Sequence, residues 1–233
     1  MKRFYHEVEV GAQDSGIQVL LDGRPVRTPA KNLLILPTRG LGEAIAAEWR
    51  AQAETIDPAS MGLTRLANSV LDNVLQNREA SIEEIARFSA TDLVCYRASE
   101  PENLATRQKD AWQPLIDWAA SAFGARVAVT DGLLPVAQSE RCLSALRKAI
   151  EAFDDFPLTG LHAATAACGS VVIGLALGHG RIDGAAAWEM SLIDETFQIE
   201  LWGEDEDAAI RRAALRRDIA SAADFLALTR NPP

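Results

Sequence analysis

The sequence predicts an α+β protein in which a small N-terminal antiparallel β domain is followed by a larger all-helical domain. Short alternating runs punctuated by glycine and proline fill the beginning of the chain, as expected of strands and tight turns. After Pro58, apolar residues recur every three or four positions, which is the period of an amphipathic helix. Because the composition changes near residue 57, we expect a β-rich domain with one helix at residues 1–57 and a helical domain at residues 58–233.

The strands of the N-terminal domain are predicted by alternation and by turn residues. Strands are expected at residues 4–10, 16–21, 26–28 and 33–36. The pair Asp22-Gly23 favours a hairpin, because both turn positions tolerate positive φ. So few short strands bury little apolar surface and need a helix to pack on. Thr38 is placed to cap such a helix, which ends before residue 57.

The remainder of the chain is predicted to be a series of helices. They are expected at residues 63–74, from 81 onward, and at 101–124, 143–153, 161–177, 183–202 and 205–228. Ser81 and Glu84 have the spacing of a capping box that would open the second of them. The segment 161–177 is almost wholly small or apolar but too short to span a membrane. We expect it to be a central buried helix.

Composition and charge exclude several classes of function. The 233 residues carry a formal net charge of -10, and basic residues gather only in the arginines of 211–217, so nucleic acid is not an expected partner. Three widely spaced cysteines without a CxxC pair indicate no disulfide framework or zinc site and favour a reducing compartment. No secretory or transit segment is visible. We expect a bacterial cytoplasmic protein without membrane insertion.

No motif for catalysis or for a cofactor is visible. A phosphate-binding loop would need a glycine-rich turn followed by Lys and Ser or Thr, and the sequence has none. Three scattered histidines are too few for a metal site. His162 and Cys168 are six residues apart and would lie on different sides of a helix, which argues against a Cys-His nucleophile. We therefore expect a protein that is not an enzyme and uses no cofactor or metal.

The segment 183–202 is the most informative part of the chain. On a helix of about 100° per residue, one side would be a stripe of two tryptophans, two aliphatic residues and one glutamate, and the opposite side would be equally apolar. The stripe consists of Trp188, Leu192, Glu195, Ile199 and Trp202. Such a helix either is enclosed in the protein or keeps one face for a partner. Glu195 in this stripe needs an intramolecular or an intermolecular partner.

Negative charge is concentrated around the same segment. Residues 183–207 contain nine acidic residues and no Lys or Arg, so nearly all of the net charge originates there. An apolar strip rimmed by charge is typical of a protein-binding surface that must stay soluble before its partner arrives. The alternative is that Trp188 and Trp202 are simply core residues.

Four separated blocks of the sequence resemble one known family. They are Leu-Asp-Gly-Arg-Pro-Val-Arg-Thr-Pro at 21–29, Leu-Thr-Arg-Leu-Ala-Asn at 63–68, Gln-x-x-x-Trp-x-Pro-Leu-x-x-Trp at 108–118 and Glu-x-Phe-Gln-x-x-x-Trp-Gly at 195–203. In this order they resemble the assembly-chaperone family of the F-type ATP synthase catalytic head, known from mitochondria. The resemblance covers nearly the whole chain, and that family has the same two-part organisation. This chain departs from the mitochondrial members in lacking a transit segment.

The resemblance implies a chaperone that binds the unassembled alpha subunit of the ATP synthase and shields its subunit interface during assembly. Together with the two-faced helix, it predicts a partner-binding surface. The predicted residues are Glu195, Gln198, Trp202, Trp188, Leu192 and Ile199. The apolar members would cover apolar surface of the partner, and the polar members would select it. The protein is expected to be monomeric when free.

Two other interpretations remain open at this point. Arg24, Arg27, Arg65 and Asn68 could line a small-molecule pocket at the domain junction, which would make the protein a ligand-binding protein or an enzyme. The chain could also be a permanent subunit of a stable complex, which predicts stoichiometric co-purification.

Overall fold

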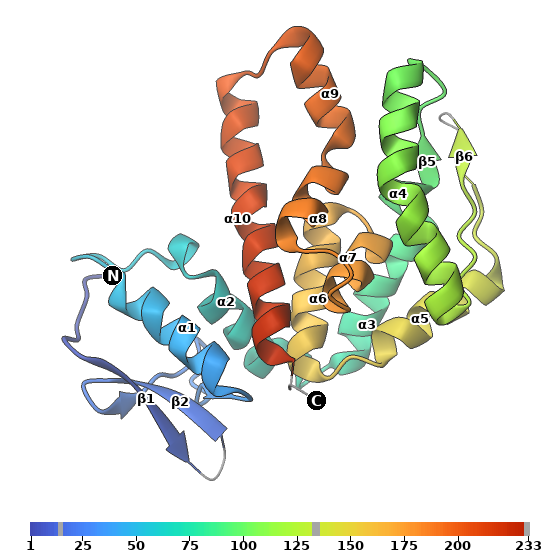
Figure 1. The fold of residues 1–233 in the computed structure, drawn as a ribbon. Helices are drawn as coiled ribbons and strands as arrows, with labels where there is room; N and C mark the ends of the chain where they lie inside the picture. The colour runs from blue at the N-terminus through green and yellow to red at the C-terminus, as the bar shows by residue number, and fades with distance from the viewer. Residues whose placement is uncertain (14–15, 132–135, 231–233) are drawn as a thin grey trace.

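The computed structural model describes residues 1–13, 16–131 and 136–230. Figure 1 shows the N-terminal unit beside a larger assembly of helices. The N-terminal unit contains a four-stranded antiparallel sheet, in which β2 pairs with each of the other three strands. The strands are β1 Val8–Gln13, β2 Gly16–Leu21, β3 Arg24–Pro25 and β4 Ile35–Leu36.

Two local signals shape this unit as predicted. Asp22 and Gly23 both have positive φ, of 48° and 75°, and they connect β2 to β3. The Thr38 side chain accepts a hydrogen bond of 3.2 Å from the backbone N–H of Leu41 and so caps helix α1, Arg39–Arg50.

Helix α1 packs closely on β1 and β2. Leu41 and Ile45 are fully buried in this contact. Gly42 permits the close approach, since a Cβ atom there would lie 2.6 Å from Cγ2 of Ile17.

From residue 58 onward the described chain is mainly helical. The helices are α2 Gly62–Ser69, α3 Arg78–Arg87, α4 Glu102–Phe123, α5 Glu140–Glu151, α6 Asp155–Cys168, α7 Val171–Gly178, α8 Gly184–Ser191, α9 Ile193–Trp202 and α10 Glu206–Thr229. Every residue of α7 is buried, and α6 packs along both α7 and α10. A short parallel pair, β5 Tyr96–Arg97 with β6 Thr130–Asp131, departs from the all-helical domain that we expected. None of the described helices is both long and apolar enough to cross a membrane.

Two groups of buried apolar side chains form the interior. One joins the sheet, α1 and α2 and extends to Val70, and the other begins at Val74 and joins the later helices. Phe156 of α6 and Phe225 of α10 reach into the first group and stack with their ring centroids 6.2 Å apart. The last helix therefore ties the two parts of the molecule together. The domain division near residue 57 stays a prediction.

The predicted central helix 161–177 is buried but interrupted. Gly169 has a φ of 64° and ends α6, a conformation that glycine adopts without a steric cost. Ser170 then caps α7 by accepting a hydrogen bond of 3.0 Å from the N–H of Ile173.

The prediction of one continuous helix over 183–202 is wrong. The chain forms α8, capped by Asp183 as expected, and then α9, with a break at Leu192, whose φ and ψ are -120° and 23°. The N–H of Leu192 bonds to the carbonyl oxygen of Glu189, three residues back, which closes α8 in a tight turn. The Leu192 side chain is buried at this turn. Because burial removes this apolar side chain from water, it favours the break at Leu192 over one continuous helix.

The capping-box prediction at Ser81 is also wrong. Helix α3 is capped four residues earlier, where the side chain of Asn77 accepts a hydrogen bond of 3.3 Å from the N–H of Ala80. Arg78 in its first turn pairs with Asp155 of α6 at 2.7 Å, and this tertiary contact fixes the earlier start. The predicted fold class is nevertheless confirmed, since antiparallel strands are followed by a predominantly helical chain.

Candidate functional site

Helices α9 and α10 run antiparallel and form a hairpin that rises above the buried helices α6 and α7 (Figure 1). Gly203 ends α9 with a φ of 85°. Asp205 then caps α10 by accepting a hydrogen bond of 2.8 Å from the N–H of Ala208. We call the end of this hairpin, residues 195–211, the hairpin tip.

Large apolar side chains are exposed at the hairpin tip. Leu201, Trp202 and Ile210 are 57%, 78% and 61% exposed. Among the described residues only three other large apolar side chains are exposed to a comparable extent, namely Met1, Phe4 and Leu75. Exposed large apolar side chains that gather in one part of a protein are typical of protein interaction sites.

Four of the six predicted partner-binding residues surround one hollow at the hairpin tip. These are Glu195, Gln198, Ile199 and Trp202. The hollow has a volume of about 240 Å³. It is bordered on its other side by residues 203–205, which we call the link between α9 and α10, and by Ala208 and Arg211 of α10. Glu195, Ile199 and Trp202 were predicted to share one side of a helix, and Gln198 was added with the family resemblance; α9 brings all four to this hollow.

The other two predicted residues lie elsewhere. Leu192 is buried at the break between α8 and α9. Trp188 is half-buried and lines a separate cleft of about 660 Å³ between α4 and α8, with α9 and α10 contributing. The guanidinium groups of Arg212 and Arg216 both lie over its indole ring, each 5.1 Å from the ring centroid. The structure therefore places neither residue at the hairpin tip.

The intramolecular partner that Glu195 requires is Arg212. Arg212 Nη1 lies 3.7 Å from Glu195 Oε2, and Arg212 Nε lies 3.1 Å from Glu204 Oε1. The Arg212 side chain is only 12% exposed, whereas that of Glu195 remains 38% exposed. A partly solvated carboxylate with one distant ion pair keeps most of its capacity to accept hydrogen bonds from a second protein.

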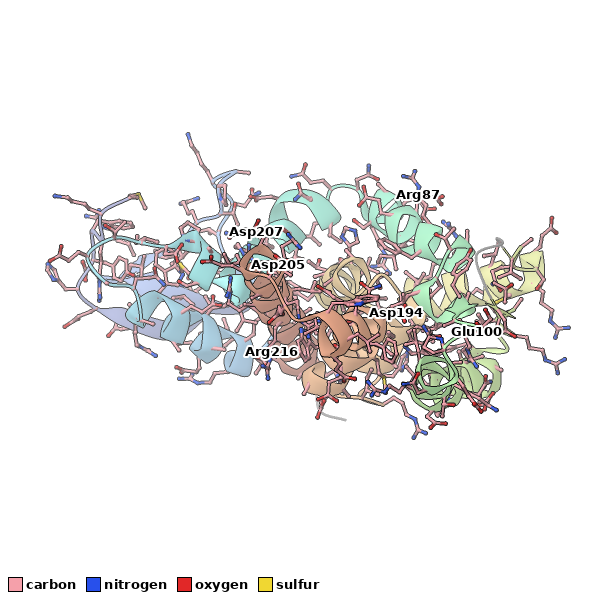
Figure 2. The ribbon with its side chains drawn as sticks, turned by 90° about the horizontal axis from the view of Figure 1, so that it is seen from above. Arg87, Glu100, Asp194, Asp205, Asp207 and Arg216 are labelled. Atoms are coloured by element: carbon pink, nitrogen blue, oxygen red, sulfur yellow. The ribbon has the colours of Figure 1, made fainter. Side chains whose placement is uncertain are left out.

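Acidic side chains surround the exposed apolar residues. Glu204 and Asp205 lie between α9 and α10, Glu206 and Asp207 lie in the first turn of α10, and Glu200 lies near the end of α9, where it pairs with Arg107; all five acidic residues are exposed. Seen from above in Figure 2, Asp205 and Asp207 lie at the start of α10, and Asp194 lies between α9 and α4. Asp194 accepts a hydrogen bond from Gln108 of α4 and is thus part of the attachment of α9. The hairpin tip therefore combines exposed apolar side chains with several acidic ones.

Comparison with known proteins identifies the family. The family model described as ATP12 chaperone protein matches residues 2–120. The chain belongs to this family. Its fold matches the crystal structure of Atp12 from Paracoccus denitrificans with a TM-score of 0.91 and 43% identity over 98% of both chains. It also matches a candidate chaperone from Agrobacterium tumefaciens with a TM-score of 0.92 and 38% identity, over 98% of this chain and 86% of that one.

A more distant relative is the mitochondrial protein atp12 of Schizosaccharomyces pombe, which is 22% identical over 95% of this chain and 81% of its own length. The resemblance to the assembly chaperones of the ATP synthase is thus confirmed, together with the chaperone class. Membership in a chaperone family fits a protein that is not an enzyme.

The residues proposed for a junction pocket do not gather at one place. Arg24 and Arg27 line a hollow of about 590 Å³ beside the N-terminal segment. Arg65 lines another, of about 450 Å³, and pairs there with Asp218 at 3.0 Å. Asn68 lines neither of these hollows. These four residues therefore do not line the single polar pocket that the small-molecule interpretation requires.

Sequence reasoning missed one buried carboxyl group, that of Asp92. Burial raises the pKa of Asp92 to about 6, although Ser170 and backbone N–H groups at the start of α7, including that of Val172 at 3.1 Å, favour the ionised form. Burial also raises the pKa of Cys95 and Cys168 to about 12, so these thiols stay protonated and unreactive at neutral pH. An isolated Asp before a short apolar run gives no sequence signal for this structural role.

Proposed function

We propose that this chain is an assembly chaperone that binds the unassembled alpha subunit of the ATP synthase catalytic head and shields its subunit interface. Membership in the ATP12 chaperone family supports the chaperone role. The similarity of its sequence blocks to alpha-binding members of that family supports the choice of subunit. The chaperone acts by occupying a surface and needs no catalytic step.

The observation that carries the proposal is the exposure of three large apolar side chains at the hairpin tip, namely Leu201, Trp202 and Ile210. Trp202 is the most exposed large apolar side chain of the described residues. Tryptophan is among the residues that contribute most to binding energy in protein interfaces. A monomeric protein gains nothing from exposing Leu201, Trp202 and Ile210 together, whereas a partner that covers them would bury this surface.

The charge of the hairpin tip indicates the chemistry of the partner surface. Glu195, Glu204 and Asp205 border the hollow, and Arg211 is the single cation among the residues that line it. A complementary surface on the alpha subunit would therefore combine apolar side chains with Lys or Arg. A standard interface of about 800 Å² per partner is enough. Its affinity must stay limited so that the beta subunit can displace the chaperone.

The two predicted residues outside the hairpin tip, Trp188 and Leu192, are not part of the docking surface that we propose. Leu192 is buried at the break between α8 and α9, and Trp188 lines the cleft beside α4, away from the hollow at the hairpin tip. We therefore expect substitutions of Leu192 to act through stability, whereas substitutions of Glu195, Gln198, Ile199 or Trp202 act directly on partner binding.

Co-purification tests the proposal. The chain is expressed with tagged alpha subunit or tagged beta subunit of the host ATP synthase, as wild type and as Glu195→Lys. We expect capture by alpha alone and its loss in the variant. Glu9→Lys makes the same charge change on the exposed side of β1 and should capture alpha normally. Capture of beta in place of alpha, or undiminished capture by a folded Glu195→Lys variant, would contradict the proposal.

A further inference from the structure

Arg212 connects three separate segments around the hairpin. It belongs to α10, but α8 and α9 enclose its side chain. Its guanidinium group pairs with Glu204 in the link and with Glu195 in α9, and it lies over the Trp188 ring of α8. It also donates a hydrogen bond of 3.3 Å from Nη2 to Oγ1 of Thr196 in α9. No other side chain of the described residues is recorded in polar or cation–π contact with all three segments.

Helix α9 has few other attachments. Phe197 is its only buried residue, and the helix starts at the break after Leu192 without a side-chain cap. On the side of α4 it is held by the ion pair of Arg107 with Glu200 at 2.7 Å and by the hydrogen bond from Gln108 to Asp194. Both members of the Arg107–Glu200 pair are about half exposed, so that contact is weak. Apart from Phe197, which is buried beneath the Arg107 guanidinium at 5.5 Å from its ring centroid, and Ile193, which packs against the helical core, α9 is held in position by polar contacts.

The contacts of Arg212 contribute more to the position of α9 than to the stability of the whole protein. Its Nη1 atom is buried and has no hydrogen-bond acceptor in the structure, because the nearest carboxylate oxygen of Glu195 is 3.7 Å away. A buried donor without an acceptor offsets part of the gain from the other contacts. Removal of the guanidinium should therefore change the position of α9 more than it changes the stability of the whole protein.

We propose that Arg212 is the positioning residue of the hairpin tip: it does not touch the partner but holds α9 so that Glu195, Gln198 and Trp202 face outward in one arrangement. The proposal rests on the proposed function. When these groups are already ordered in the free protein, less conformational entropy is lost on binding and the affinity is higher. A planar guanidinium suits the task because it reaches several acceptors in fixed directions, which a Lys ammonium cannot do.

Two substitutions test this role by titration with purified alpha subunit. Arg212→Met keeps a long side chain that packs on Trp188 but removes the polar contacts, and we expect binding at least tenfold weaker than that of the wild type. Arg212→Lys keeps the positive charge but lacks the planar guanidinium group, and we expect it also to bind alpha several-fold more weakly than the wild type does. Arg217→Met, which removes an exposed arginine of the same helix, should bind like the wild type. Wild-type affinity in either Arg212 variant would overturn the proposal.

Amide hydrogen exchange of the free proteins supplies a readout that does not depend on the partner. In Arg212→Met, exchange should accelerate in residues 193–204 while α6 and α7 keep wild-type protection. Unchanged exchange in α9 would overturn the positioning role. If wild-type protein fails to bind alpha, the proposed function is wrong, and the exchange data still decide whether Arg212 holds α9. If wild type binds and Arg212→Met binds equally well, the proposed function stands and the inference is wrong.

Discussion

Helices α7 and α9 are both rich in apolar residues, yet α7 lies at the centre of the helical part and α9 lies at its surface. All residues of α7 are buried and none is charged. Helix α9 buries only Phe197 and carries Asp194, Glu195 and Glu200 among its apolar residues. Apolar content therefore does not decide burial by itself. The carboxylates keep α9 at the surface because each would need a buried partner inside.

The same contrast applies to the carboxylates themselves. Asp92 is enclosed in the core, and its oxygens accept hydrogen bonds from the N–H groups of Val94 and Val172 at 3.2 and 3.1 Å. Glu195 at the surface has one ion pair at 3.7 Å. The first is a structural connection between a loop and the start of α7, and the second is available to another molecule. Substitutions of Asp92 and in α7 should therefore change the stability of the fold, whereas substitutions at the exposed face of α9 should change partner binding.

The largest effect on stability is expected from Ile173→Ala in α7. Ile173 is fully buried, so its truncation should lower the free energy of unfolding by about 2–5 kcal/mol. The matched change in α9, Ile199→Ala, should cost less than about 1 kcal/mol because that residue is only half-buried. Urea unfolding measures both. Comparable losses in the two variants would show that α9 belongs to the core.

The pH dependence of stability should identify Asp92. Its pKa is about 6 in the folded protein against 3.8 for the free group, so between these values the folded state retains a proton that the unfolded state releases. Stability is therefore expected to fall as pH rises from about 4 to 6, by roughly 3 kcal/mol for this group. Asp92→Asn should remove that part of the dependence in urea titrations at several pH values. An identical pH profile in the variant would exclude Asp92 as its source.

Trp202→Ala should separate binding from stability. The side chain is mostly exposed, so we expect a change in unfolding free energy within about 0.5 kcal/mol. Binding of alpha subunit should weaken by about 2 kcal/mol or more, as for a hot-spot residue. Phe4→Ala removes another exposed aromatic ring from the N-terminal unit and serves as the control in the same binding titration. Equal effects of the two substitutions on binding would place the surface elsewhere.

The smallest effect is expected from Glu200→Gln. The ion pair of Glu200 with Arg107 is about half exposed, and such pairs contribute roughly 0–1 kcal/mol. We expect a shift of the melting temperature of no more than a few degrees, decreasing further at high salt. A loss as large as that of Ile173→Ala would mean that the α4 side, rather than Arg212, determines the position of α9.

Much of the fold follows from local sequence signals. The Asp22-Gly23 turn, the Thr38 cap and the stop at Gly124, which has a φ of 72°, all lie where predicted. Helix α10 likewise begins after Asp205. These features depend on one or two residues and their own backbone. The division of 183–202 into α8 and α9 was not predictable, because it depends on the burial of Leu192 among distant segments.

The candidate site was partly predictable for the same reason. Glu195, Ile199 and Trp202 share one side of α9, so their spacing was enough to bring them together, whereas Gln198 was predicted from the family resemblance. The helical period also grouped Trp188 with them, and the break at Leu192 separates it from the hollow. The partner of Glu195 required the tertiary structure, because the four arginines of 211–217 are equivalent in sequence and it is Arg212 that lies within ion-pair distance of Glu195.

The most direct test of the account is amide hydrogen exchange of the complex with purified alpha subunit. If the hairpin tip is the docking surface, residues 195–211 should gain protection on binding, whereas the outer strand β1 and the buried helix α7 should keep the exchange rates of the free protein. Protection that appears in the N-terminal unit and leaves the hairpin tip unchanged would contradict the account.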